Sequence, residues 1–168
     1  MISVNSLVAA KREISTGVEA ADPNPLREVD ALQESQLLDS RVCQLNSTAA
    51  LLFELRTSLQ FDAGNAALLV VRRLGYFGWR SSTLPTPPAA LTVVSSEPDS
   101  TADSFRMSFE FFPAARLDVA GSQAEFYVLE VEGIGDAPPD YTEMNQEDLR
   151  SGLPSWSSPC DLLQASSV

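Results

Sequence analysis

The segment at residues 105–111 alternates strictly between apolar and polar side chains, and this pattern constrains the fold more than any other in the chain. Successive side chains of a β-strand point to opposite faces, so its four apolar residues would share one face. The other face would carry Arg106, Ser108 and Glu110. The pattern predicts a strand with one buried and one solvated face, which is typical of an antiparallel sheet.

Similar short apolar stretches recur from residue 41 onward, separated by turn-forming residues. The expected strands are a short one around Val42 and Leu45, followed by residues 49–56, 66–73, 75–80, 91–94, 105–111, 116–119 and 124–131. The second and third of these would form one hairpin across the turn at residues 62–65, and the last two would form another. Residues 66–73 are apolar on both faces, which indicates a central strand, and 75–80 would be an edge strand. Residues 84–88 are rich in proline, which cannot continue a sheet ladder, so they are expected to be a loop.

Helical patterns are confined to the two ends of the chain. Asn24 and Pro25 resemble a cap and a first helical residue, and apolar residues at three-to-four spacing predict a helix over residues 25–37. Asn145 and Asp148 predict the capped start of a single helical turn. The expected fold class is therefore α+β, a predominantly antiparallel curled sheet or sandwich of about seven strands, with an N-terminal helix and a short C-terminal helix.

The chain of 168 residues is long enough to bury a core of its own. We expect an N-terminal arm at residues 1–22, loosely held or forming one short helix, a single α+β domain at 23–150, and an irregular C-terminal tail at 151–168. No apolar run is long enough to span a membrane, and the first residues lack the order of charge and apolar block of a secretory signal. A cytoplasmic location is expected.

Histidine is absent, which excludes histidine-activated nucleophiles and imidazole metal sites. The two cysteines, Cys43 and Cys160, are too few for a zinc site. In a reducing compartment both are expected to be free thiols, and Cys43 is interpreted as a small packed residue in a strand. No cofactor motif or calcium loop is present in the sequence, so no cofactor or metal is expected.

Negative charge is concentrated in the second half of the chain, where residues 97–168 hold fourteen acidic residues against three arginines. Such a field attracts a cationic protein and repels nucleic acid and anionic membranes. The candidate partner-binding residues are Glu130, Glu132, Asp136, Asp140, Glu143, Glu147 and Asp148. The alternatives are a merely solvated surface or oxygen ligands for a hard cation.

Two carboxylates interrupt apolar strands and are the candidates for acid–base chemistry, namely Glu54 and Glu110. Both would fall on the solvent face of their strands, where water is the default neighbour. Arg56 and Arg106 lie on the same faces and are the expected ion-pair partners.

A group of aromatic residues beside Arg80 resembles a stacking platform for a base or a sugar; its members are Tyr76, Phe77 and Trp79. Overall acidity argues against nucleic acid, because phosphate contacts supply most of that affinity. Aromatic residues in strands mostly pack against neighbours, so packing is the favoured interpretation.

In size, acidity and β-rich character, and in its lack of cofactor motifs, the chain is similar to many bacterial immunity proteins, which block a toxin by direct binding. The resemblance implies a non-catalytic acidic protein-binding module of the immunity type, which neutralises a basic toxin or enzyme. The alternative is a small-molecule-binding protein or enzyme, with a pocket inside the curled sheet between the segment around Trp79 and the strand at 105–111.

Overall fold

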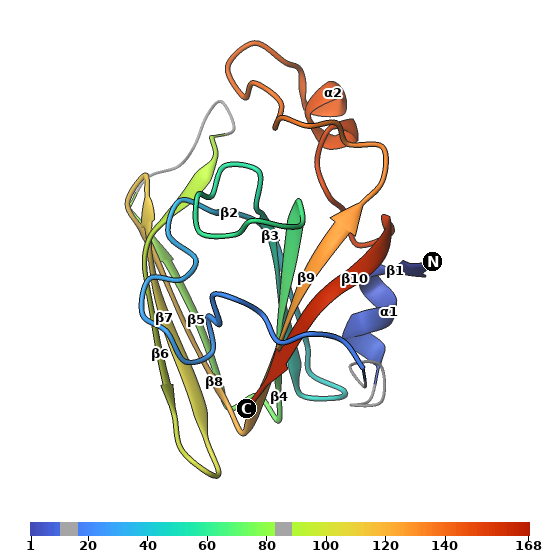
Figure 1. Cartoon of the computed structure of the whole chain (residues 1–168). Coiled ribbons are helices and arrows are strands. Elements are labelled where there is room, and N and C mark those ends of the chain that lie inside the picture. The colour runs from blue at the N-terminus through green and yellow to red at the C-terminus, as the bar shows by residue number, and fades with distance from the viewer. Residues whose placement is uncertain (11–16, 83–88) are drawn as a thin grey trace.

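The computed structural model describes residues 1–10, 17–82 and 89–168 (Figure 1). The predicted loop at residues 84–88 lies outside these ranges. The elements are β1 (Ile2–Ser3), α1 (Val4–Ala9), β2 (Gln36–Cys43), β3 (Thr48–Glu54), β4 (Ala66–Arg72), β5 (Tyr76–Ser81), β6 (Leu91–Ser100), β7 (Phe105–Phe112), β8 (Ala115–Gly121), β9 (Gln123–Val131), α2 (Gln146–Ser151) and β10 (Pro159–Ser167).

The strands follow the order β1-β10-β9-β4-β3-β2-β6-β7-β8-β5, and neighbouring strands in this order are antiparallel. Only Gln36 and Leu37 of β2 pair with β6, so the sheet bends sharply there. Figure 1 shows the resulting two layers facing each other, β6, β7, β8 and β5 on one side and the remaining strands on the other. The predicted α+β class with an antiparallel sheet is confirmed. The strand count is higher than predicted, with ten strands in the described residues.

The larger core lies between the two layers and is built from the inward faces of alternating strands. In β7 every second residue is buried, so the alternation at residues 105–111 is confirmed. Phe109 of this strand contacts Phe53 of β3 across the core, with ring centroids 5.8 Å apart. The apolar face of the strand thus joins one layer to the other.

A second core covers the opposite face of the larger layer. Val4 and Leu7 of α1 pack there together with Trp156, which explains why β4 is buried on both faces. Arg72 fastens this end of the chain, since its guanidinium binds the buried Glu125 at 2.7 Å and the carbonyl of Ala10 at 2.7 Å. The N-terminal residues are therefore part of the fold, through β1 and α1.

The helix predicted over residues 25–37 is wrong, because this stretch forms successive turns and then enters β2. Asp30 and Glu34 have φ of 60° and 68°, which a right-handed helix does not allow. Their amide groups bond to carbonyls of β6 instead, Asp30 to Ser96 at 2.7 Å and Glu34 to Val93 at 2.9 Å. Leu26 and Leu32 are buried, so the apolar spacing marked core residues without marking a helix.

The interpretation of residues 151–168 as an irregular tail is also wrong, since β10 pairs with β9 from Cys160 to Ser167. This strand has partly exposed side chains of mixed polarity and a bulge between Leu162 and Gln164, so it lacks the regular alternation of apolar and polar residues by which β7 was predicted. The predicted short strand near Val42 begins earlier, at Gln36, and Leu45 lies exposed in the turn that follows.

One of the two predicted hairpins is confirmed, because β3 and β4 pair along their whole length. The other is wrong: β8 pairs with β7 and β5, whereas β9 pairs with β4 and β10. The chain passes from one layer to the other at Gly121, where an added Cβ would lie 2.6 Å from the carbonyl oxygen of Arg72. The glycine therefore permits a tight crossover between layers in place of a hairpin turn. The edge position predicted for residues 75–80 is confirmed by β5 at one end of the strand order.

Among the described residues, no helix has the length and apolar character needed to cross a membrane.

Candidate functional site

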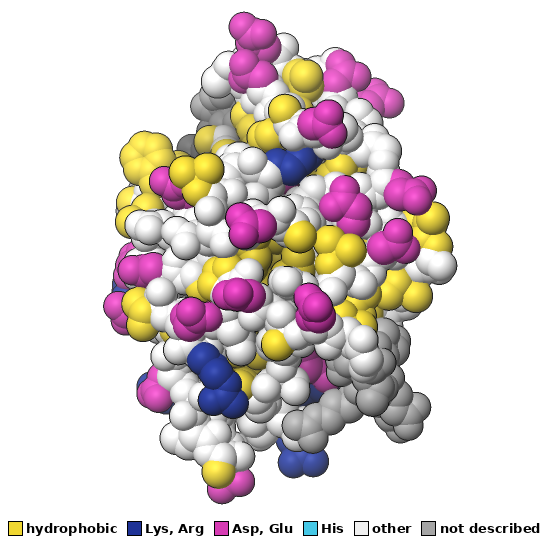
Figure 2. Space-filling view, in the orientation of Figure 1, with side chains coloured by type: hydrophobic (Ala, Val, Ile, Leu, Met, Phe, Trp, Pro, Cys, Tyr) yellow, Lys and Arg dark blue, Asp and Glu magenta, His cyan; other side chains and the backbone are white. Residues whose placement is uncertain are grey.

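The seven predicted partner-binding carboxylates all lie on one excursion of the chain, from the end of β9 through α2, which we call the acidic segment (residues 130–151). All seven residues are exposed. Figure 2 shows acidic side chains over the top of the molecule, where Figure 1 places α2 and the loop before it. The fold thus brings these residues together on one end of the molecule.

Three of the seven carboxylates have local roles. Glu130 accepts a hydrogen bond from Asn65 at 3.2 Å, and Asp148 bonds reciprocally with Asn145, the N-cap of α2, as the sequence predicts. Asp140 accepts from the amide and hydroxyl of Thr142, which lowers the pKa of its carboxyl. No ion pair within the described residues involves the other four, which are Glu132, Asp136, Glu143 and Glu147. These four carboxylates are free to meet a cation from outside.

Arg56 attaches the acidic segment to the sheet. Its guanidinium bonds to both carboxylate oxygens of Glu54, at 2.8 and 2.6 Å, and the two side chains are 5% and 0% exposed. The remaining N–H groups donate to backbone carbonyls of the acidic segment and of the residue that follows α2, namely Ile134 at 2.6 Å, Gly135 at 3.2 Å, Ala137 at 2.9 Å and Gly152 at 2.7 Å. One buried ion pair therefore holds both ends of the excursion.

The expectation that Glu54 faces water is wrong, although its predicted pairing with Arg56 is confirmed. The acidic segment folds back over this end of β3 and excludes solvent from the carboxylate. The role of Arg56 as the anchor was not predicted from the sequence. Its carbonyl partners lie about eighty to a hundred positions away in the chain, and local sequence patterns carry no information about contacts at that separation. The one available signal was an Arg two positions after a Glu in an otherwise apolar strand.

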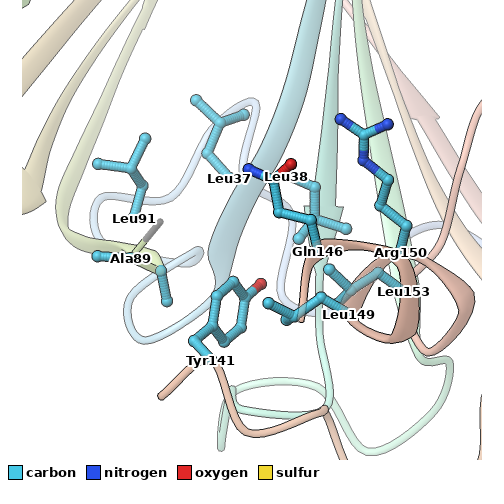
Figure 3. Close-up of a pocket in the computed structure, with 10 residues that line it drawn as sticks. Leu37, Leu38, Ala89, Leu91, Tyr141, Gln146, Leu149, Arg150 and Leu153 are labelled. Atoms are coloured by element: carbon cyan, nitrogen blue, oxygen red, sulfur yellow. The ribbon is translucent and has the colours of Figure 1, made fainter. Parts of the chain in front are cut away.

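Beneath the acidic segment lies an apolar hollow of about 260 Å³. Figure 3 shows Leu37 and Leu91 of the sheet on one side, with Tyr141 and Leu149 of the acidic segment facing them. Burial raises the pKa of the Tyr141 hydroxyl. Polar side chains in the lining come from Gln146 and Arg150. The hollow has the chemistry of a socket for an apolar side chain, and the charged residue among those that line it is Arg150.

Glu110 pairs with Arg116 across the strands at 2.5 Å, so the predicted partner Arg106 is wrong. Glu110 lies on the solvent face of β7, as expected, whereas Glu54 lies on the far face of the other layer, beneath the acidic segment. The two carboxylates do not form a catalytic pair.

On the concave side of the sheet near Trp79, where the alternative function places a pocket, two aromatic side chains pack against their neighbours. Trp79 packs on Phe111 with ring centroids 5.7 Å apart, and Phe77 packs against the core. Both aromatic residues thus pack against neighbours, as favoured from the sequence, and Trp79 keeps 45% of its surface exposed at the edge of the sheet. Tyr76 differs in its position, because it lies on the outer face of β5, where it is 59% exposed.

Both cysteines are free thiols, as predicted. Cys43 is exposed rather than packed, because β2 is solvated beyond its first residues. Cys160 is buried, and burial raises its pKa to about 11. The described residues contain no group of three or more acidic, cysteine or histidine side chains placed to hold a metal ion.

We expect a thiol reagent such as Ellman's reagent to modify Cys43 rapidly in the native protein and Cys160 only after unfolding. The thiolate is the reactive form, and Cys160 is both inaccessible and protonated at neutral pH. Absorbance should report one fast equivalent in buffer and two in denaturant, and reductant should leave Tm unchanged. Two fast equivalents in buffer, or none, would contradict these placements.

Comparisons of the chain with protein-family models, curated proteins and solved structures found no match.

Proposed function

We propose that this protein is a non-catalytic binding module that engages a basic protein through the acidic segment, in the manner of an immunity-type inhibitor. The observation that supports this most directly is that four exposed carboxylates, without ion-pair partners in the described residues, stand on a segment held by the buried Arg56. A solvated surface needs no such anchor, whereas a binding surface gains affinity when it is ordered beforehand.

The hollow beneath the segment extends the proposal to the kind of partner. Its volume of about 260 Å³ and its leucine lining suit one apolar side chain of the partner. Lysine or arginine residues elsewhere on the partner surface would reach the exposed carboxylates of the acidic segment. The expected partner surface is therefore a basic patch centred on an exposed apolar residue, such as the active-site rim of a cationic toxin or enzyme.

The test begins with capture and identification of the partner from the native host, with products of neighbouring genes examined first. With that partner, reversal of Glu132, Asp136 and Glu143 to lysine is expected to slow association at least about tenfold at low salt, because charge steers encounter. The wild-type association rate is expected to fall steeply between dilute buffer and half-molar salt. Stopped-flow or surface plasmon measurements supply both rates. The variant spares Asp140 and Asp148, whose carboxylates support local structure.

A matched control reverses Glu97, Asp99 and Asp103, which are exposed residues at the β6–β7 hairpin, at the opposite end of the molecule (Figure 1). It makes the same change in net charge and is expected to affect association much less. Equal losses in the two variants would show that only net charge matters. If the variant with Glu132, Asp136 and Glu143 reversed binds the partner as well as the wild type does, the proposal is wrong and the acidic segment is only a solvated surface.

A further inference from the structure

The outer face of β5, β8 and β7 carries a second hollow, of about 380 Å³, away from the acidic segment. Two cross-strand rows form it. In one row Tyr76 lies opposite Ala120, which lies opposite Arg106; in the next, Gly78, Asp118 and Ser108 are aligned in the same way. Ala120 and Gly78 have small or no side chains, so the surface is depressed at these two positions relative to the larger side chains around them.

Tyr76 lies flat along this floor instead of standing away from the sheet. A Cβ placed on Gly78 would come within 2.5 Å of the Tyr76 hydroxyl oxygen and 2.8 Å of two ring carbons. The ring therefore occupies the space that any other residue at position 78 would fill. Since Tyr76 is 59% exposed, an aromatic surface remains open to a ligand.

The polar groups beside the ring are held in place by one another. Asp118 accepts hydrogen bonds from the Ser108 hydroxyl at 2.6 Å and from Arg116 Nε at 2.8 Å. Arg116 in turn binds Glu110. The hydrogen bond from Arg116 lowers the pKa of Asp118, so this carboxylate remains an acceptor near neutral pH. The hollow thus offers fixed acceptors and donors within one small area.

We propose that this hollow binds one sugar residue of a neutral carbohydrate, with the ring of Tyr76 as its platform. The electron-rich face of an aromatic ring attracts the C–H groups on one face of a pyranose. Each sugar hydroxyl both donates and accepts, which matches a lining that mixes Asp118, Ser108 and guanidinium groups. This site is independent of the function proposed above.

Dimensions and charge favour this ligand over others. Tyr76 and Arg106 are two strand spacings apart, roughly 10 Å, which leaves room for one sugar ring. An anionic ligand would meet Asp118 in a chain of net charge −12, and Arg116 is already engaged by Asp118 and Glu110. A neutral polyhydroxy ligand would not be repelled by these negative charges.

The test is affinity electrophoresis of the whole chain in native gels that contain soluble glucan, mannan, galactan or glycol chitin. We expect the wild type to be retarded by at least one polymer. Tyr76→Ala is expected to weaken that retardation at least about fivefold, because the platform is lost. Gly78→Ala keeps the tyrosine but displaces its ring, and should act in the same direction.

Phe112→Ala is the matched control, since Phe112 is an exposed aromatic residue on the same outer face of β7 but outside the lining of the hollow. It should be retarded like the wild type. The proposal is overturned if no polymer retards the wild type, if Tyr76→Ala is retarded fully, or if Phe112→Ala loses as much as Tyr76→Ala. Loss of retardation in ten-millimolar phosphate would instead indicate an anion site, and would overturn it too. Tyr76 is exposed, so its variant tests the site even if Gly78→Ala fails to fold.

Discussion

Replacing Arg56 with methionine is expected to lower the free energy of unfolding by about 3–5 kcal/mol, because the change leaves a fully buried carboxylate without its partner. Glu54 is 0% exposed, and both of its carboxylate oxygens bond to this guanidinium. The same substitution removes four hydrogen bonds to carbonyls of the excursion. Urea denaturation followed by circular dichroism measures the loss. Hydrogen exchange should rise first in the acidic segment.

Two further variants show whether the effect comes from the orphaned charge. A double variant, Glu54→Leu with Arg56→Met, removes both charges and should recover part of the stability lost in the single variant. Arg116→Met breaks two partly exposed pairs, with Glu110 and Asp118, whose side chains are 51% and 31% exposed, and should cost far less than Arg56→Met. If Arg56→Met is as mild as Arg116→Met, the anchor does not contribute as described.

The Phe109→Ala variant is expected to lose about 3–5 kcal/mol of folding free energy, since truncation leaves a cavity between the two layers. Phe109 is 0% exposed, and its ring lies 5.8 Å from those of Phe53 and Phe111. Phe111→Ala should behave similarly, because its side chain is also buried and packs on Trp79. Chemical denaturation gives the values, and near-ultraviolet circular dichroism reports the loss of aromatic packing.

Ser108→Ala is the control on the opposite face of the same strand. It removes one hydrogen bond to Asp118 and should cost less than about 1.5 kcal/mol. A loss at Ser108 equal to that at Phe109 would mean that the two faces of β7 are not buried and solvated as the structure has them.

The candidate site was accessible to sequence reasoning only in part. Five of the seven carboxylates, from Asp136 to Asp148, lie among glycine, proline and polar residues with little apolar patterning, so their exposure followed from composition. Their common position required the fold, because Arg56 attaches their backbone to a strand nearly eighty residues earlier in the chain. The hollow beneath them joins Leu37 to Leu149, a contact that no local pattern encodes.

The sequence by itself determined those elements whose periodicity is local and whose neighbours agree with it. The alternation of β7, the two apolar faces of β4 and the Asn145 cap of α2 all follow from the residue order, because pleating and capping act over a few residues.

Tertiary structure alone decided the conformation or burial of the other residues. Leu26 and Leu32 have helical spacing in the sequence. This stretch forms turns instead, because carbonyls of β6 accept hydrogen bonds from the amides of Asp30 and Glu34. β10, which lacks a regular apolar alternation, became a strand because β9 offered an edge with backbone groups to satisfy. Glu54 became buried because a distant segment closed over it, and burial depends on what covers a residue as well as on its own polarity.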